Sequence, residues 1–134
     1  MILISRFISE THPNTGAVSL TSTSSTFSGG ITVAAGTILR VGVDSTGSAG
    51  APTAGPLGTG TLTLNGGTLA TSGVTARTVL NASTLGGDVA LGDAIGTGKL
   101  TLGGPINLGG ATRGLTLTNK IKFDGVTSNG GLVS

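Results

Sequence analysis

Apolar and polar residues alternate in short runs along most of the chain, and glycines follow nearly every run. The clearest run is Gly58–Leu69, GTGTLTLNGGTL, in which Leu62 and Leu64 alternate with threonines ahead of an Asn-Gly-Gly at 65–67. Side chains along a strand alternate sides, so the leucines share one face and the threonines the other. Asn-Gly tolerates positive φ and is a strong turn signal. The run therefore predicts a strand, a turn and the start of a second strand.

The same unit returns twice further along the chain. Residues 96–104 read GTGKLTLGG, at a spacing of 96 − 58 = 38 residues, and residues 114–119 read GLTLTN. A strand unit of this size cannot bury its apolar face alone, and repetition implies that copies stack. The repeats therefore predict a solenoid.

Similar alternating runs predict strands over the rest of the sequence. Within 37–43 the inward residues are expected to be Ile38 or Leu39, together with Val41. Glycine interrupts every candidate helix, so the expected fold class is all-β. Further strands are expected at 1–8, 17–23, 31–33, 61–64, 68–70, 77–81, 88–91, 99–102, 105–108, 114–118 and 120–124. Residues 1–16 form a strand (1–8) and a linker arm (9–16), residues 17–134 form the repeat domain, and a loop near 44–57 protrudes from it.

Composition selects among all-β architectures. Glycine accounts for 26 of 134 residues, charged residues for 9% and aromatic residues for 2%. Sandwiches and barrels usually have aromatic core residues and charged outer faces, whereas small aliphatic cores with threonine-rich faces fit a parallel β-helix better. The predicted fold is a parallel β-helix with an N-terminal extended strand and arm.

Charge, hydropathy and cysteine content limit which partners and covalent links the sequence predicts. The net charge is +2, and the seven basic residues are scattered along the sequence, so no basic stripe for nucleic acid is expected. No apolar run reaches the ~20 residues of a membrane-spanning helix, so no membrane insertion is expected. The chain has no cysteine, so it can form neither a disulfide nor a thiolate metal site. Residues 1–8 are too short an apolar run for a signal-peptide core.

Candidate catalytic and metal-binding groups are few. His12, the single histidine, lies in the linker arm, where a solvated loop position is the default over a Ser-His-Asp triad. Asp88 and Asp93 are read as turn aspartates, with a calcium repeat as the weaker alternative. The Gly-Lys at 98–99 is followed by leucine, so a phosphate loop is excluded. No cofactor, metal site or enzymatic activity is expected, and the glycosylation sequon at 81–83 is read as a chance match.

Residues 27–42, FSGGITVAAGTILRVG, resemble the autotransporter passenger-associated β-strand repeat. Residues 57–69, 85–89 and 123–132 are similar to it as well. This resemblance implies a right-handed parallel β-helix from a secreted bacterial surface protein. It also implies an extracellular or cell-surface location.

These readings favour a structural, self-assembling fibre or surface-layer subunit that stacks head to tail with copies of itself. The alternative is an adhesin that binds glycans on cell surfaces. In the structural hypothesis residues 1–8 are donated to a neighbour, and the eight-residue arm at 9–16 spans about 26 Å at ~3.3 Å per residue. The alternative for this strand is that it folds back as a cap on its own solenoid. The residues predicted to form the contact between subunits are Ile2, Ile4, Phe7, Leu132 and Val133.

Overall fold

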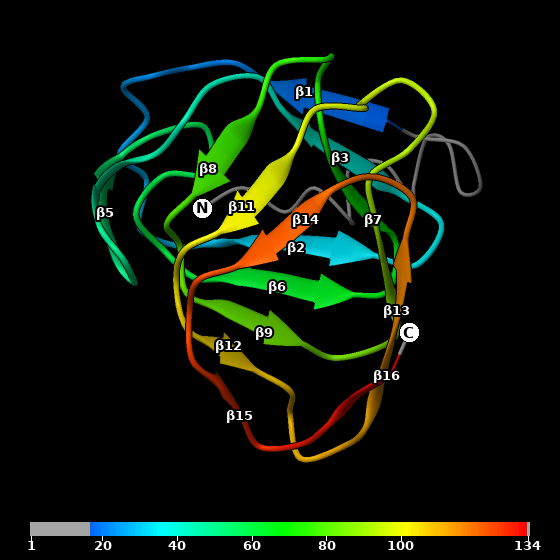
Figure 1. The fold of residues 1–134 in the computed structure, drawn as a ribbon. Helices are drawn as coiled ribbons and strands as arrows, with labels where there is room; N and C mark the ends of the chain where they lie inside the picture. Colours follow the sequence, from blue (N-terminus) through cyan, green and yellow to red (C-terminus); the bar gives the residue numbers. More distant parts are fainter. Residues whose placement is uncertain (1–16, 134) are drawn as a thin grey trace.

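The computed structural model describes residues 17–133, which form a parallel β-solenoid without any helix (Figure 1). Three sheets form its sides, and every pairing within them is parallel. The five-stranded sheet takes one strand from each turn, so the solenoid has about five turns. The predicted all-β solenoid fold is confirmed.

Each sheet collects strands from successive turns of the chain. The six-stranded sheet contains β1 (Ala17–Leu20), β3 (Ile38–Val41), β7 (Thr68–Thr71), β10 (Val89–Leu91), β13 (Arg113–Leu117) and β16 (Leu132–Val133). The five-stranded sheet contains β2 (Ile31–Ala34), β6 (Leu62–Asn65), β9 (Ser83–Leu85), β12 (Ile106–Asn107) and β15 (Thr127–Ser128). The three-stranded sheet contains β8 (Arg77–Val79), β11 (Leu100–Leu102) and β14 (Ile121–Phe123).

The length of one turn differs from the repeat spacing seen in the sequence. Leu62 lies opposite Ser83, and Leu100 lies opposite Ile121, so both of these turns take 21 residues. The three copies of the Leu-Thr-Leu unit fall in β6, β11 and β13, one on each sheet. The 38-residue spacing is therefore not the structural repeat, because it carries the chain through one turn and two further sides.

The core is built from inward-facing aliphatic columns. Leu39, Leu69 and Leu91 lie in register on neighbouring strands of the six-stranded sheet and are at most 1% exposed. Leu62 and Leu64 are buried and Thr63 between them is only half-buried, which confirms the predicted alternation. Of the inward positions left open for the 37–43 strand, the structure selects Leu39 and Val41.

The turn after β6 follows the Asn-Gly-Gly prediction. Gly66 and Gly67 have φ of 102° and 77°, in the left-handed region that favours glycine. A Cβ at Gly67 would also come within 2.5 Å of the Ala34 carbonyl oxygen, one turn earlier. These two glycines let the chain turn the corner between sheets while packing against the turn before it.

The segment predicted as a loop at 44–57 contains an antiparallel hairpin. Its strands are β4 (Thr46–Ser48) and β5 (Ala51–Ala54). Neither strand has a large aliphatic residue, so the sequence carried no periodic apolar signal there. The strands β9, β15 and β16 were not predicted, and the prediction at 105–108 shortens to the two residues of β12.

Candidate functional site

At the C-terminal end of the solenoid, the last strand of each sheet has one edge without a partner in the part of the chain that the structure describes. The last strands of the three sheets, β14, β15 and β16, each pair on one side with β11, β12 and β13 respectively. No strand among residues 17–133 pairs with their other sides. Unpaired N–H and C=O groups along such an edge are a template for a further strand.

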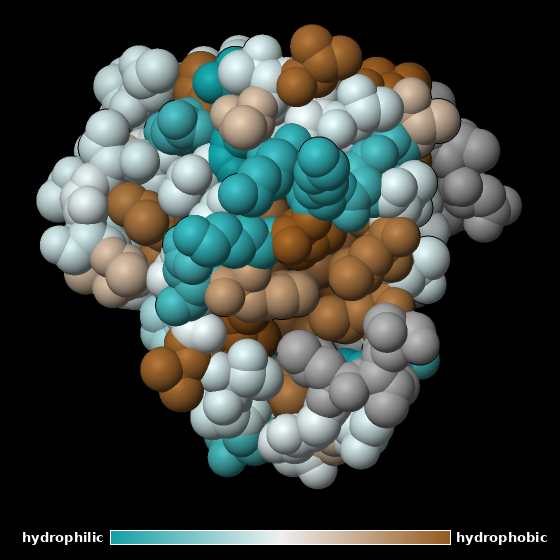
Figure 2. Space-filling view, in the orientation of Figure 1, coloured by the Kyte–Doolittle hydropathy of each residue, from teal (hydrophilic) through white to brown (hydrophobic). Residues whose placement is uncertain are grey.

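The core also loses its cover at this end. The column of Leu39, Leu69 and Leu91 ends at Leu117, which lies opposite Leu91 and is 45% exposed. Thr127, which lies opposite buried Ile106, is exposed as well, and Val126 beside it on the outer face is 77% exposed. Figure 2 shows a hydrophobic area on this face, between the regions where Figure 1 draws β14 and β16. The last turn therefore presents apolar side chains beside its unpaired backbone.

A small cavity of about 10 Å³ lies in the core beneath this end. Its lining is wholly aliphatic and aromatic, and it comprises Leu64, Leu85, Val89, Leu91, Leu102, Ile106, Leu115 and Phe123. Such a void offers no polar group to a substrate, and it is a packing gap of the core.

The structure places two of the predicted contact residues at this end. Leu132 and Val133 form β16, opposite Arg113 and Gly114 of β13. The other three, Ile2, Ile4 and Phe7, lie outside the described residues, as does His12. The strand predicted at 1–8 and the arm at 9–16 lie outside them too.

The edge of the three-stranded sheet at β8 is hydrogen-bonded to other backbone, whereas the opposite edge, at β14, has no partner among residues 17–133. The Ser45 N–H donates to the Thr78 carbonyl oxygen (3.0 Å), and the Gly50 N–H donates to that of Leu80 (2.7 Å). A carboxylate oxygen of Asp44 accepts from the Thr78 N–H (3.0 Å). Asp44 and Ser45 before β4, and Gly50 in the turn between β4 and β5, thus occupy the place that a strand before β8 would take.

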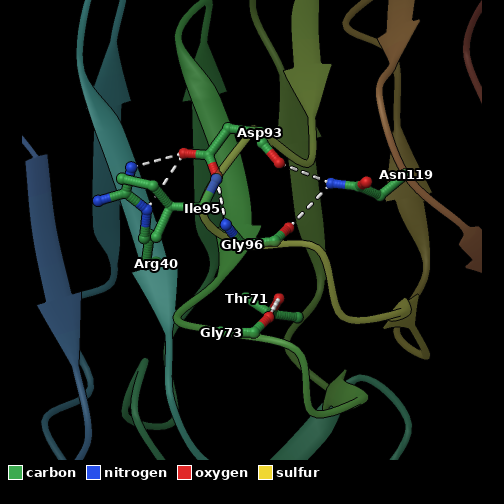
Figure 3. A network of polar contacts seen from close by, with 7 residues as sticks. All are labelled: Arg40, Thr71, Gly73, Asp93, Ile95, Gly96 and Asn119. Carbon is green, nitrogen blue, oxygen red and sulfur yellow. Dashed lines mark hydrogen bonds and ion pairs between the residues drawn. The ribbon is translucent and has the colours of Figure 1, made fainter.

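A polar network joins the turns at the corner after the six-stranded sheet (Figure 3). Asp93 Oδ2 accepts from Arg40 Nε at 3.1 Å and Nη2 at 2.6 Å. Asp93 Oδ1 accepts from the backbone N–H groups of Ile95 and Gly96. Asn119 Nδ2 donates to the carbonyl oxygens of Asp93 and Gly96, at 2.9 Å each. Both carboxylate oxygens of Asp93 accept hydrogen bonds from within the fold, so the network is structural.

The charge of Asp93 is stabilised by this network. Burial raises the pKa of its carboxyl, but hydrogen bonds from the Gly96 N–H, Arg40 and the Ile95 N–H, together with the Arg40 charge, outweigh burial. The net effect is a pKa below the usual value of 3.8. The aspartate is therefore ionised in the folded protein at neutral pH.

Asp88 is also a turn aspartate, as expected. Its Oδ1 accepts from the Gly114 N–H at 2.7 Å. Within residues 17–133 no three His, Cys, Asp or Glu side chains gather closely enough to hold a metal ion. The same residues include no helix long and apolar enough to cross a membrane.

Asn81, the acceptor of the formal glycosylation sequon, is 1% exposed. Its Nδ2 donates to the carbonyl oxygens of Leu57, Gly58 and Gly60, the last at 2.8 Å. The nitrogen that a glycan would modify is thus engaged inside the fold, and Asn81 serves to hold the loop before β6.

Sequence reasoning missed a gathering of basic side chains. Lys99, Lys120 and Lys122 are scattered in the sequence but lie in or directly before the adjacent strands β11 and β14. Three of the seven basic residues thus gather on one face of the fold, whereas the prediction that no basic stripe for nucleic acid exists stays a prediction. The available signal was the 21-residue separation of Lys99 and Lys120, which equals one turn of the solenoid.

Residues 17–133 therefore form a β-solenoid with the Arg40–Asp93–Asn119 network at one corner and strand edges without a partner at the C-terminal end. Comparisons with protein-family models, with curated proteins and with solved structures gave no match. The resemblance to the autotransporter-associated repeat and the extracellular location therefore stay predictions.

Proposed function

We propose that the protein is a structural, non-enzymatic subunit that self-assembles by head-to-tail stacking of its solenoid. The observation that carries this proposal is the C-terminal turn, where three strand edges have no partner among residues 17–133 and Leu117 of the core is exposed. Pairing a further turn onto this end would satisfy backbone groups and cover the core, as strand addition does in other assemblies.

The order of sheets defines what a neighbour must supply. The chain passes from the six-stranded sheet to the three-stranded side, then to the five-stranded sheet, and then back. The next turn after β16 therefore needs a segment on the three-stranded side and one on the five-stranded side. After those two segments, a strand such as β1 would continue the six-stranded sheet.

Residues 1–16 have a suitable length for these two segments. The passages between strands of the six-stranded sheet contain 17 residues at 21–37, 17 at 72–88, 21 at 92–112 and 14 at 118–131. The passage at 42–67 is longer because it holds the hairpin. Sixteen residues from a second copy can thus complete the turn above β16 and bring β1 of that copy into line with β16.

The apolar residues at 2, 4 and 7 are the groups expected to cover the exposed core. Burial of Ile2, Ile4 and Phe7 would contribute about 1.5–3 kcal/mol each. A contact between opposite ends of identical chains is heterologous, so it extends into a fibre unless the rotation closes a ring.

The experiment compares the full chain with a variant that lacks residues 1–16, using negative-stain microscopy and sedimentation velocity. The full chain is expected to form ordered fibres, and the shortened chain is expected to stay short or monomeric. A length-preserving variant, Ile2→Ser with Ile4→Ser and Phe7→Ser, should fail in the same way. Ser5→Ala with Ser9→Ala is the matched control and should assemble normally.

Two results would overturn the proposal. One is fibres of normal length and order without residues 1–16. The other is a full chain that stays monomeric at high concentration while the shortened chain is less stable to urea, because this pattern identifies residues 1–16 as a cap on their own solenoid.

A further inference from the structure

The three lysines of the chain gather on the outer face of the three-stranded sheet, beside the open end. Lys122 lies in β14, and Lys99 and Lys120 directly precede β11 and β14. All three side chains are exposed. Figure 2 shows hydrophilic side chains gathered in the region where Figure 1 draws β11 and β14.

The register of the two strands sets the lysines side by side. Leu100 lies opposite Ile121, and the Leu100 N–H donates to the Lys120 carbonyl oxygen at 3.0 Å. Lys99 and Lys120, each one residue earlier, are therefore neighbours on adjacent strands, at a strand spacing of about 4.8 Å. Like charges at this spacing repel and destabilise a sheet.

Little in the surrounding structure neutralises this charge. Asp124 lies 3.1 Å from the Lys122 ammonium, in a pair whose side chains are 54% and 46% exposed. No carboxylate among residues 17–133 forms an ion pair with Lys99 or Lys120. Two adjacent ammonium groups thus face solvent, which favours a ligand that brings several negative charges.

Hydroxyl groups adjoin the lysines on the same face. Thr78, Thr101 and Lys122 form one outward row across β8, β11 and β14. Phe123, the only aromatic residue in these three strands, packs against the core. The face therefore offers cations and hydroxyl groups, without the outward aromatic rings on which nucleic-acid bases stack.

We propose that the face formed by Lys99, Lys120, Lys122, Thr78 and Thr101 binds an acidic polysaccharide. The ammonium groups pair with carboxylate or sulfate groups, and the threonine hydroxyls exchange hydrogen bonds with sugar hydroxyls. The binding needs only one copy of the chain, so it is independent of the proposed stacking. Stacking would repeat the face along a fibre and raise avidity for a long polymer.

The experiment measures binding of the full chain to heparin, polygalacturonate, neutral dextran and single-stranded DNA over a range of salt concentrations. The test variant is Lys99→Gln with Lys120→Gln and Lys122→Gln, which changes the net charge from +2 to −1 (2 − 3). The matched control is Thr32→Glu with Thr84→Glu and Ser128→Glu, which makes the same change on the five-stranded sheet. Thermal unfolding checks that all three proteins fold.

The wild type and the control are expected to bind both acidic polysaccharides and not to bind dextran. Ionic contacts to the lysines should make log affinity fall as log salt rises, because binding releases counterions. The lysine variant should bind at least tenfold more weakly, with a slope near zero. If the lysine variant binds as tightly as the wild type, the proposal is overturned. If the lysine variant and the control lose affinity equally, the proposal is also overturned, because net charge alone would then account for binding. DNA bound more tightly than either polysaccharide would overturn the assigned ligand class.

Discussion

Arg40 and Asp93 form an ion pair across two turns of the solenoid, with 2.6 Å between Nη2 and Oδ2 (Figure 3). They are 53 residues apart in the sequence. Arg40 lies in β3, and Asp93 follows β10, with β7 between them. Two strand spacings amount to about 10 Å, which a long arginine side chain can span.

Small residues along the path make room for this arginine. Arg40 lies opposite Ala70 in β7, and the next position in the same column is Gly92. A larger side chain at either place would occupy the path of the guanidinium group. Asn119 then ties the Asp93 loop to the following turn. One corner of the solenoid is thus clamped across four turns by three polar side chains.

The clamp predicts that Arg40→Met lowers the free energy of unfolding by about 1.5–3 kcal/mol, measured by urea denaturation. The reason is that Asp93, only 17% exposed, would keep its charge and lose its cationic partner. Lys122→Met is the matched control, because it removes an exposed pair worth about 0–1 kcal/mol. Similar losses in the two variants would contradict a special role for the Arg40–Asp93 pair.

Asp93 also predicts how stability depends on pH. Because its pKa is lowered in the folded state, the unfolded chain binds more protons between the two pKa values. The stabilisation is therefore fully present above the unfolded pKa of about 3.9 and is lost as pH falls through the folded pKa. Urea denaturation of the wild type and Asp93→Asn between pH 6 and pH 2 should show a shallower acid-side decline in the variant. Parallel curves would rule out this contribution.

Gly96 lies at the centre of the clamp, and it predicts a steric effect. A Cβ at this position would collide with the Thr71 carbonyl oxygen and come within 2.9 Å of the Ala70 Cβ. Gly96→Ala is expected to cost about 1–3 kcal/mol of stability, as overpacking does. Gly73→Ala is the control, since nothing lies within 4 Å of its Cβ position. The control should unfold at an unchanged or slightly higher urea concentration, because alanine restricts the unfolded chain.

Asn81 predicts a loss of stability through its buried hydrogen bonds. Asn81→Ala leaves the carbonyl oxygens of Leu57, Gly58 and Gly60 without their side-chain donor and should cost about 1–3 kcal/mol. Asn65→Ala is the control, because Asn65 is exposed at the end of β6. Thermal unfolding of both variants measures the difference. An Asn81 variant as stable as the control would show that backbone pairing alone holds this loop.

The sequence predicted strands correctly where every second residue is apolar and buried. The Leu62 and Leu64 alternation predicted β6, and the glycines at 66 and 67 predicted the following turn, because both signals are local. The hairpin at 46–54 was missed because its two strands are held by backbone pairing with each other and carry no local apolar pattern. The strands β9, β15 and β16 were missed because backbone pairing with the preceding turn holds them.

The candidate sites were harder to predict, because they depend on which residues the turns bring together. Arg40 and Asp93 are adjacent only because β7 and its neighbours take particular turn lengths. Lys99 and Lys120 are adjacent because one turn takes 21 residues there, while the visible repeat suggested 38. An irregular solenoid hides such pairings until each turn length is known.

The open edge of β15 yields a final prediction about assembly. The N–H groups of Ile106 and Leu108 donate to the carbonyl oxygens of Val126 and Ser128. In a parallel ladder the Thr127 N–H then points away from β12, toward the unpaired side. Thr127→Pro removes this outward donor, as prolines at natural sheet edges do, while it leaves the bonds to β12 in place.

Thr127→Pro is therefore expected to keep the monomer folded, with less than about 1 kcal/mol lost in urea denaturation, because Thr127 is exposed and proline at such an edge removes no ladder hydrogen bond. Sedimentation velocity and negative-stain microscopy should show at least tenfold fewer assembled subunits than in the wild type. Thr127→Ala, which retains the N–H, should assemble normally. If Thr127→Pro folds and still forms fibres of normal length, the free edge of β15 is not where the next copy pairs, and growth must proceed through another surface.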